Sequence, residues 1–133
     1  MQFVFNNRNI PIISKDFLIE YPIGGDENCN KRKDVSDLKC LYPYINFEIE
    51  NNKVKWVENY ETLENLEKRI EKLLYYIGSR KEKHIAIVGH SSYLGQMKDS
   101  VVGDESNELK HCYPYKIIAN YDKDGNFVSL RKK

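Results

Sequence analysis

Residues 84–97, HIAIVGHSSYLGQM, hold the residue types in this chain that could do chemistry in a ligand pocket. A short apolar run leads to Gly89 and His90, and a helix is predicted to begin directly after them. Gly89 is expected to let the backbone turn sharply, so that His90 points out of the carboxyl edge of a strand. Ser91 and the two residues after it would then present amides at a helix N-terminus, which attract anions such as phosphate. A histidine there can donate to a phosphate oxygen or move a proton near neutral pH.

His90 also has a purely structural interpretation. It could cap the helix or satisfy a hydrogen bond in the core, and its position alone does not separate these roles. The chain has three histidines, so few partners are available. His84 begins the apolar run beside lysines and is expected to be exposed to solvent. His111 precedes another apolar run and could approach the same sheet edge, so its role stays open.

Other catalytic and binding motifs are absent from the sequence. The nucleophile elbow needs Gly-x-Ser-x-Gly, and Tyr93 occupies the fifth position of Gly89-His-Ser-Ser-Tyr93. A metal site would need further histidines or carboxylates close to His90, and none lies between residues 84 and 98. The Gly24-Gly25 pair fits no nucleotide-binding pattern. We therefore predict no metal site and no cofactor.

The elements that must position His90 are a helix and a strand. Apolar residues repeat at three- and four-residue steps from about 61 to 79, which predicts an amphipathic helix. The run at 84–88 lacks alternation, which is typical of a strand covered on both faces. A helix, a buried strand and a second helix in this order favour an α/β fold.

The remaining elements are shorter. Residues 22–36 contain proline, paired glycine and many charges, so we predict a long loop there, and a second loop around 102–107. Asp122-Lys-Asp-Gly125 supplies a hairpin turn. The other expected elements are strands or extended segments at 2–5, 10–14, 45–50, 54–57, 111–120 and 126–131, and a short helix at 34–41.

The composition narrows the class of protein. The 21 basic and 20 acidic side chains nearly cancel, which argues against a nucleic-acid or membrane-surface partner. No apolar run is long enough for a membrane span, and no secretory signal is visible at the N-terminus. Cys29, Cys40 and Cys112 are odd in number and irregularly spaced, which fits reduced thiols in a cytoplasmic location.

Several blocks of the sequence, in order, resemble the histidine phosphatase superfamily, also called phosphoglycerate mutase-like. The segment 84–97 looks like its second-histidine motif. Glu61-Thr62 followed by Arg69 resembles its "ES…R" helix, and LKHCYPYKI looks like the edge strand that follows. Residues 17–47 resemble an insert of a eukaryotic-type subgroup. Together the blocks span roughly residues 10–120.

The resemblance implies roles for individual residues. His90 matches the second pocket histidine, which contacts the transferred phosphoryl group. Glu20 matches the acid that gives a proton to the leaving oxygen, although Ile19 stands where arginine is common. Ser91 and Arg32 would bind phosphate, Arg32 from the rim of the pocket. For Glu20 the alternative is an exposed loop carboxylate.

The sequence departs from the family at its defining motif. Arg-His-Gly, which supplies the nucleophilic histidine and a clamp arginine, is absent, and Asn7-Arg8-Asn9 has no histidine. The resemblance implies a partial phosphoglycerate mutase-like sheet with helices on both faces, in a single domain over residues 1–133 that is truncated at its N-terminus. Loss of the first strand would leave the strand at 84–88 with an exposed edge.

Three functions follow as expectations. The first is a histidine phosphatase-like protein that is inactive as an isolated chain, because phosphohistidine chemistry needs a nucleophile and a clamp together. It could still bind phosphate or a phosphorylated small molecule. The second is a phosphomonoester hydrolase completed by a partner chain or through a homo-oligomer. The third is an interaction module without catalysis. The sequence names no substrate.

Overall fold

The computed structural model describes residues 10–24, 32–49, 60–102 and 109–132. These ranges form helices and two small sheets, so the predicted α/β class is confirmed. The chain divides into two compact units, one of residues 1–16 and 23–60 and one of residues 17–22 and 61–133. A single domain over residues 1–133 stays a prediction.

The first unit contains a small β-α-β arrangement. Strands β1 (Ile12–Ser14) and β2 (Ile45–Phe47) pair in parallel, and helix α2 (Val35–Leu41) lies between them in sequence. Parallel strands require such a crossover because the chain must return before it can pair in the same direction. Helix α2 ends with Tyr42 as its C-cap, since the residue before Pro43 is kept out of the helical region.

The second unit is built on helix α3 (Leu63–Gly78), which confirms the helix predicted at 61–79. Its N-cap is Thr62, whose hydroxyl accepts a hydrogen bond from the Asn65 N–H at 3.4 Å. The apolar stripe of α3 faces inward, and Leu66 and Leu73 on it are almost fully buried. This stripe stabilises the helix through packing, because most helical stability in proteins comes from burial of an amphipathic face.

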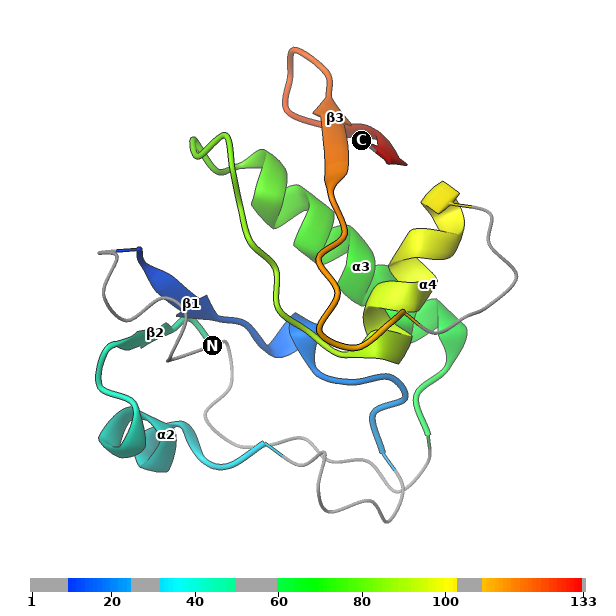
Figure 1. Ribbon diagram of the computed structural model, residues 1–133. Coiled ribbons are helices and arrows are strands. Elements are labelled where there is room, and N and C mark those ends of the chain that lie inside the picture. The colour runs from blue at the N-terminus through cyan, green and yellow to red at the C-terminus, as the bar shows by residue number, and fades with distance from the viewer. Residues whose placement is uncertain (1–9, 25–31, 50–59, 103–108, 133) are drawn as a thin grey trace. The chain divides into compact units, whose positions relative to one another are not determined.

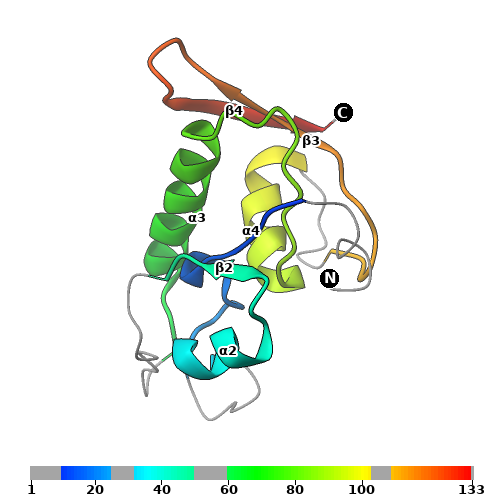
Figure 2. The same cartoon turned by 90° about the vertical axis from the view of Figure 1, so that its left-hand side faces the viewer.

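Helix α4 (Ser91–Val102) and a hairpin complete the second unit. The hairpin pairs β3 (Ile117–Tyr121) with β4 (Phe127–Lys132) in antiparallel fashion. Helices α3 and α4 lie side by side, and the hairpin lies near their C-terminal ends (Figure 1; Figure 2). The predicted hairpin turn is confirmed, with Gly125 in the left-handed region at φ 85°.

The core of the second unit lies between α3, α4 and the segment before Glu20. Its buried members are Leu66, Leu73, Tyr93 and Met97. Partly buried side chains pack around them: Phe17, Leu18, Tyr21, Ile70, Ile77, Ile87, Leu94 and Leu130. The core therefore joins the N-terminus of α4 to the residues around Glu20.

Gly78 allows the hairpin to pack on the end of α3. A Cβ atom at this position would lie 2.5 and 2.7 Å from two ring carbons of Tyr121. The Tyr121 hydroxyl donates to the Leu74 carbonyl at 2.7 Å, which holds the ring in place. Only glycine leaves room for this ring.

The prediction of a buried strand at 84–88 was wrong. These residues form no strand with the residues that the structure describes, and Ile85 and Val88 are 41% and 52% exposed. A strand exists through hydrogen bonds to a neighbouring strand, and within the described ranges β3 and β4 pair with each other instead. In these ranges the structure has two separate two-stranded sheets in place of the predicted sheet with helices on both faces.

Two other strand predictions were partly correct. The strand predicted at 111–120 begins only at Ile117, since Cys112 has a positive φ of 56° and Pro114 cannot donate to a ladder. The segment 45–50 is a strand over its first three residues. The predicted segments 2–5 and 54–57 lie outside the described residues.

Candidate functional site

His90 and Glu20, which are 70 positions apart in sequence, lie next to each other in the second unit. The imidazole Nδ1 of His90 is 3.6 Å from Oε2 of Glu20. The histidine side chain is 53% exposed and the carboxylate 18%, so solvent or a ligand can reach the imidazole. At this distance the two groups interact as charges when the imidazole is protonated, and they are not directly hydrogen-bonded.

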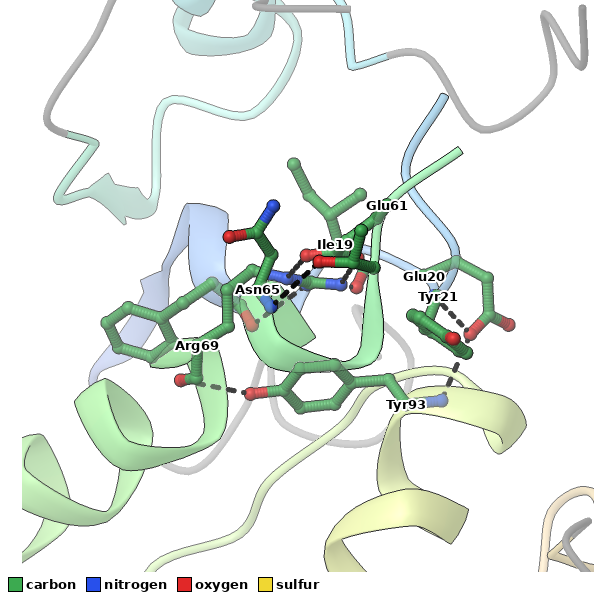
Figure 3. A network of polar contacts seen from close by, with 9 residues as sticks. Ile19, Glu20, Tyr21, Glu61, Asn65, Arg69 and Tyr93 are labelled. Carbon is green, nitrogen blue, oxygen red and sulfur yellow. Dashed lines mark hydrogen bonds and ion pairs between the residues drawn. The ribbon is translucent and has the colours of Figure 1, made fainter. Parts of the chain in front are cut away.

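The Glu20 carboxylate is oriented by backbone amides. Its Oε1 accepts a hydrogen bond from its neighbour, the Tyr21 N–H, at 2.8 Å, and a second from the Tyr93 N–H at 3.2 Å. Tyr93 is the third residue of α4, so its amide belongs to the first turn and has no partner within the helix. The carboxylate thus lies at the positive end of α4 (Figure 3). Glu20 is therefore not a free loop carboxylate.

His90 takes the position just before α4 begins. Its carbonyl accepts the first helical hydrogen bond, from the Leu94 N–H at 3.0 Å, while its side chain lies beside Glu20. Ser91 is the first residue of α4 and is half-buried. The helix predicted after His90 is confirmed. The His90 carbonyl accepts the first hydrogen bond of this helix, and the imidazole stays accessible to solvent.

The turn expected at Gly89 does not require glycine. The φ of Gly89 lies outside the left-handed region, and a Cβ there would come 3.4 Å from the Leu94 side chain, which is an ordinary contact. The chain enters α4 without a backbone conformation that requires glycine. The position of His90 therefore depends on the helix and its neighbours rather than on this glycine.

Arg69 supports the segment that carries Glu20. Its guanidinium forms a two-bonded ion pair with Glu61, from Nε to Oε1 at 2.7 Å and from Nη2 to Oε2 at 2.5 Å. Its Nη1 donates to the carbonyls of Phe17 at 3.3 Å and Ile19 at 2.7 Å. Both partners of the ion pair are nearly buried, with 12% of the arginine and 6% of the glutamate side chain exposed.

The amide of Tyr93 was expected at the helix N-terminus, but its side chain was not singled out in the sequence. Its side chain is fully buried, and its hydroxyl donates to the Arg69 carbonyl at 3.4 Å. Burial raises the pKa of Tyr93 to about 12, so the phenol stays protonated at neutral pH. The structure adds that the Tyr93 amide donates to the Glu20 carboxylate and that the Tyr93 ring is buried next to Arg69.

Arg32 belongs to the first unit, whereas Glu20 and His90 belong to the second. Its Nε lies 2.9 Å from Oδ1 of Asp16, and its Nη1 donates to the Lys33 carbonyl at 3.0 Å. The arginine is thus engaged by neighbours of its own unit. Its role in binding phosphate stays a prediction.

The other histidines lie outside the contacts described for Glu20. His84 is exposed, as expected, and His111 is exposed beside Cys112. In the described ranges no cluster of three or more His, Cys, Asp or Glu side chains could hold a metal ion. None of the helices in these ranges is long and apolar enough to cross a membrane.

The arrangement defines a class of site in which a histidine and a carboxylate meet at a helix N-terminus. Comparison with known proteins gives two similar proteins of Arabidopsis thaliana. The chain is 38% identical over 89 residues to a "Phosphoglycerate mutase-like protein", covering 65% of this chain and 33% of that protein. It is 37% identical over 87 residues to "Phosphoglycerate mutase-like protein 1", covering 63% of this chain and 30% of that protein.

These similarities relate the chain to phosphoglycerate mutase-like proteins and, through them, to the histidine phosphatase superfamily. The relationship predicted from the second-histidine block and its neighbours is thereby confirmed. The chain spans about a third of the length of the curated relatives it matches. No protein-family model and no solved structure matches it.

Proposed function

We propose that these 133 residues carry one half of a phosphoryl-binding site of the histidine phosphatase type and are catalytically inactive by themselves. In this half-site His90 contacts the phosphoryl group and Glu20, when protonated, gives its proton to the leaving oxygen. Ser91 contributes its amide at the N-terminus of α4. Arg32 is assigned to the rim of the phosphate pocket.

The 3.6 Å approach of Glu20 to His90 carries this proposal. A proton donor and a phosphate-contacting histidine must lie within a few ångströms of one phosphoryl group, since proton transfer requires hydrogen-bond reach in the reacting complex. The N-terminus of α4 adds partial positive charge at the same place. These features support anion binding and protonation of a leaving group.

We propose inactivity because the sequence lacks the residues that would perform the other half of the reaction. A covalent phosphohistidine needs a nucleophilic histidine and a cationic clamp acting together. The 133 residues contain no Arg-His-Gly, and the Arg69 guanidinium is already bound to Glu61 and to backbone carbonyls. His90 and Glu20 therefore lack the partners that would cleave a phosphomonoester.

The proposal is tested by separating binding from catalysis. Inorganic phosphate or vanadate added to the ¹⁵N-labelled chain should shift the resonances of His90, Ser91 and Tyr93 in a saturable way. His90→Ala should abolish the titration, and His84→Ala serves as the matched control because that histidine is exposed outside these contacts.

Catalysis is measured on the same preparations with p-nitrophenyl phosphate, and no hydrolysis above buffer is expected. Hydrolysis that disappears in His90→Ala would overturn the inactive assignment. Failure of both anions to bind would instead favour the interaction module without a phosphate pocket.

Completion by a partner chain is a second candidate, favoured by the exposed apolar side chains of Ile85 and Val88. A strand paired along residues 84–88 would cover them and could bring a nucleophile to His90. We would add a synthetic apolar peptide ending in Arg-His-Gly and measure binding and p-nitrophenyl phosphate hydrolysis. Activity that needs both components and is lost in His90→Ala is expected. A peptide that does not bind would contradict this candidate.

We also propose that the protein is located in the cytoplasm. It is supported by Cys40 and Cys112, which are exposed free thiols. Reducing compartments keep such thiols unpaired. Both should react with a thiol reagent in freshly lysed cells without prior reduction, and an oxidised pool would argue against this location.

A further inference from the structure

The geometry points to Arg69 as the positioning residue that sets the place of the Glu20 carboxylate at the N-terminus of α4. This inference deepens the proposed function and rests on it for the chemical role of Glu20. Arg69 contacts neither His90 nor the Glu20 carboxylate through the hydrogen bonds described above. Its action on Glu20 therefore passes through the backbone.

The backbone link is the pair of carbonyls that Arg69 holds. Ile19, whose carbonyl accepts from Nη1 at 2.7 Å, is the residue directly before Glu20. Phe17, whose carbonyl accepts at 3.3 Å, lies three residues before it in η1 (Asp16–Leu18). Fixing two carbonyls within three residues fixes the direction in which the next side chain leaves the backbone.

A second link returns to Arg69 through α4. The carboxylate of Glu20 accepts from the Tyr93 N–H at 3.2 Å, and the Tyr93 ring lies under the guanidinium, 4.9 Å from its central carbon. The Tyr93 hydroxyl donates to the Arg69 carbonyl. Arg69, Ile19, Glu20 and Tyr93 thus form a closed circuit of contacts, and the labelled side chains of Figure 3 follow it. A closed circuit restrains its members more than a single bond does.

The guanidinium of Arg69 binds partners within this circuit of contacts and is not placed to bind a phosphate. Arginine has five N–H donors, and four hydrogen bonds to Glu61 and the two carbonyls are formed. The carboxylate of Glu61 balances the buried guanidinium, so the local net charge is near zero. An arginine whose N–H donors are bound in this way orients the residues that it contacts.

Lysine cannot replace arginine here. A guanidinium presents a planar fork that bonds a carboxylate with two nitrogens and still reaches other acceptors, while an ammonium is a compact point charge. Arg69→Lys would retain the charge beside Glu61 but lose the simultaneous hold on Phe17 and Ile19. The variant therefore tests geometry at constant charge.

The experiment follows hydrogen exchange at the Tyr93 amide in the full chain without ligand. In the wild type this N–H donates to the Glu20 carboxylate at 3.2 Å, and no acceptor within the helix is available to it. We expect exchange about tenfold faster in Glu20→Ala, the loss typical of a removed helix-capping bond, and the same acceleration in Arg69→Lys. The double variant should exchange no faster than either single variant.

Arg80→Lys is the matched control. Arg80 lies in the same unit, pairs with Glu82 at 2.7 Å and lies over the ring of Tyr76, away from the hydrogen bonds by which Arg69 holds Phe17 and Ile19. Its replacement should leave Tyr93 exchange unchanged. If Arg69→Lys does not fold, Glu61→Gln keeps the shape of the ion-pair partner and weakens the anchor of Arg69, and the same acceleration is expected.

The positioning role is overturned if Arg69→Lys lowers stability but leaves Tyr93 exchange at the wild-type rate while Glu20→Ala accelerates it. It is also overturned if the effects of the two substitutions simply multiply in the double variant. Because no ligand is present, this measurement is independent of phosphate binding. A chain that binds no phosphate but shows the coupled exchange would refute the proposed function and retain the positioning role of Arg69.

Discussion

The carboxylate of Glu20 accepts a hydrogen bond at 3.2 Å from the amide of Tyr93, 73 positions later in the chain. This single contact brings the acid predicted by resemblance to the first turn of the helix that follows His90. It gives Glu20 a structural role in addition to the proposed chemical one, because the amide would otherwise have no partner within the helix. Removing the carboxylate should therefore be measurable in stability as well as in ligand binding.

Glu20→Ala should lower the free energy of unfolding by about 1 kcal/mol, the usual loss when a helix N-terminal cap is removed. Glu20→Gln should lose less, because its side-chain carbonyl can still accept from the Tyr93 N–H. Urea denaturation followed by circular dichroism measures both variants. Equal losses for the two variants would show that the charge of Glu20, rather than its hydrogen bond, stabilises α4.

The buried ion pair between Arg69 and Glu61 should be strongly coupled. Arg69→Ala or Glu61→Ala alone should destabilise the chain by about 3–5 kcal/mol, because each leaves an unpaired buried charge. The double variant should lose clearly less than the sum of the single losses. The exposed pair Lys68–Glu64 on the same helix offers the control, and Lys68→Ala there should change stability little. Additive losses at Arg69 and Glu61 would contradict the coupling.

Gly78→Ala should destabilise the chain by about 1–3 kcal/mol, since the new methyl group would overlap the ring of Tyr121. In a Tyr121→Ala background the same substitution should be nearly neutral, because the obstructing ring is gone. Gly89→Ala is the control, with its new methyl group in ordinary contact with Leu94. Thermal melts of these variants test the prediction. A loss at Gly78 that persists without the tyrosine ring would have another cause.

Tyr93 should make stability fall at alkaline pH. Burial raises its pKa from 10.0 to about 12, so the folded chain favours the neutral phenol. This contribution is fully present below pH 10 and is lost as the pH rises from 10 to about 12, by up to roughly 3 kcal/mol. Urea midpoints of the wild type and Tyr93→Phe across this range measure the difference. Parallel pH profiles for the two proteins would refute it.

Local sequence patterns predicted the elements whose stability comes from their own residues. Helix α3 was predictable because its apolar stripe repeats at helical spacing, and α2 ends where Pro43 requires it. The hairpin turn was predictable because Asp122 and Gly125 favour it locally. His90 was recognisable for the same reason, since the apolar run, the histidine and the following helix are adjacent in sequence.

The tertiary structure decided everything that depends on residues far apart in sequence. The run at 84–88 has the composition of a buried strand, yet in the described ranges it pairs with none, because hydrogen-bonded pairing is supplied by another segment and cannot be encoded in the run itself. Glu20 likewise lies beside His90 through contacts with residues far away in the sequence, among them the Tyr93 amide. The sequence by itself determined the helices and drew attention to His90, and its resemblance to a known family drew attention to Glu20. Only folding brought the two side chains together, since their contact is made through space and not along the chain.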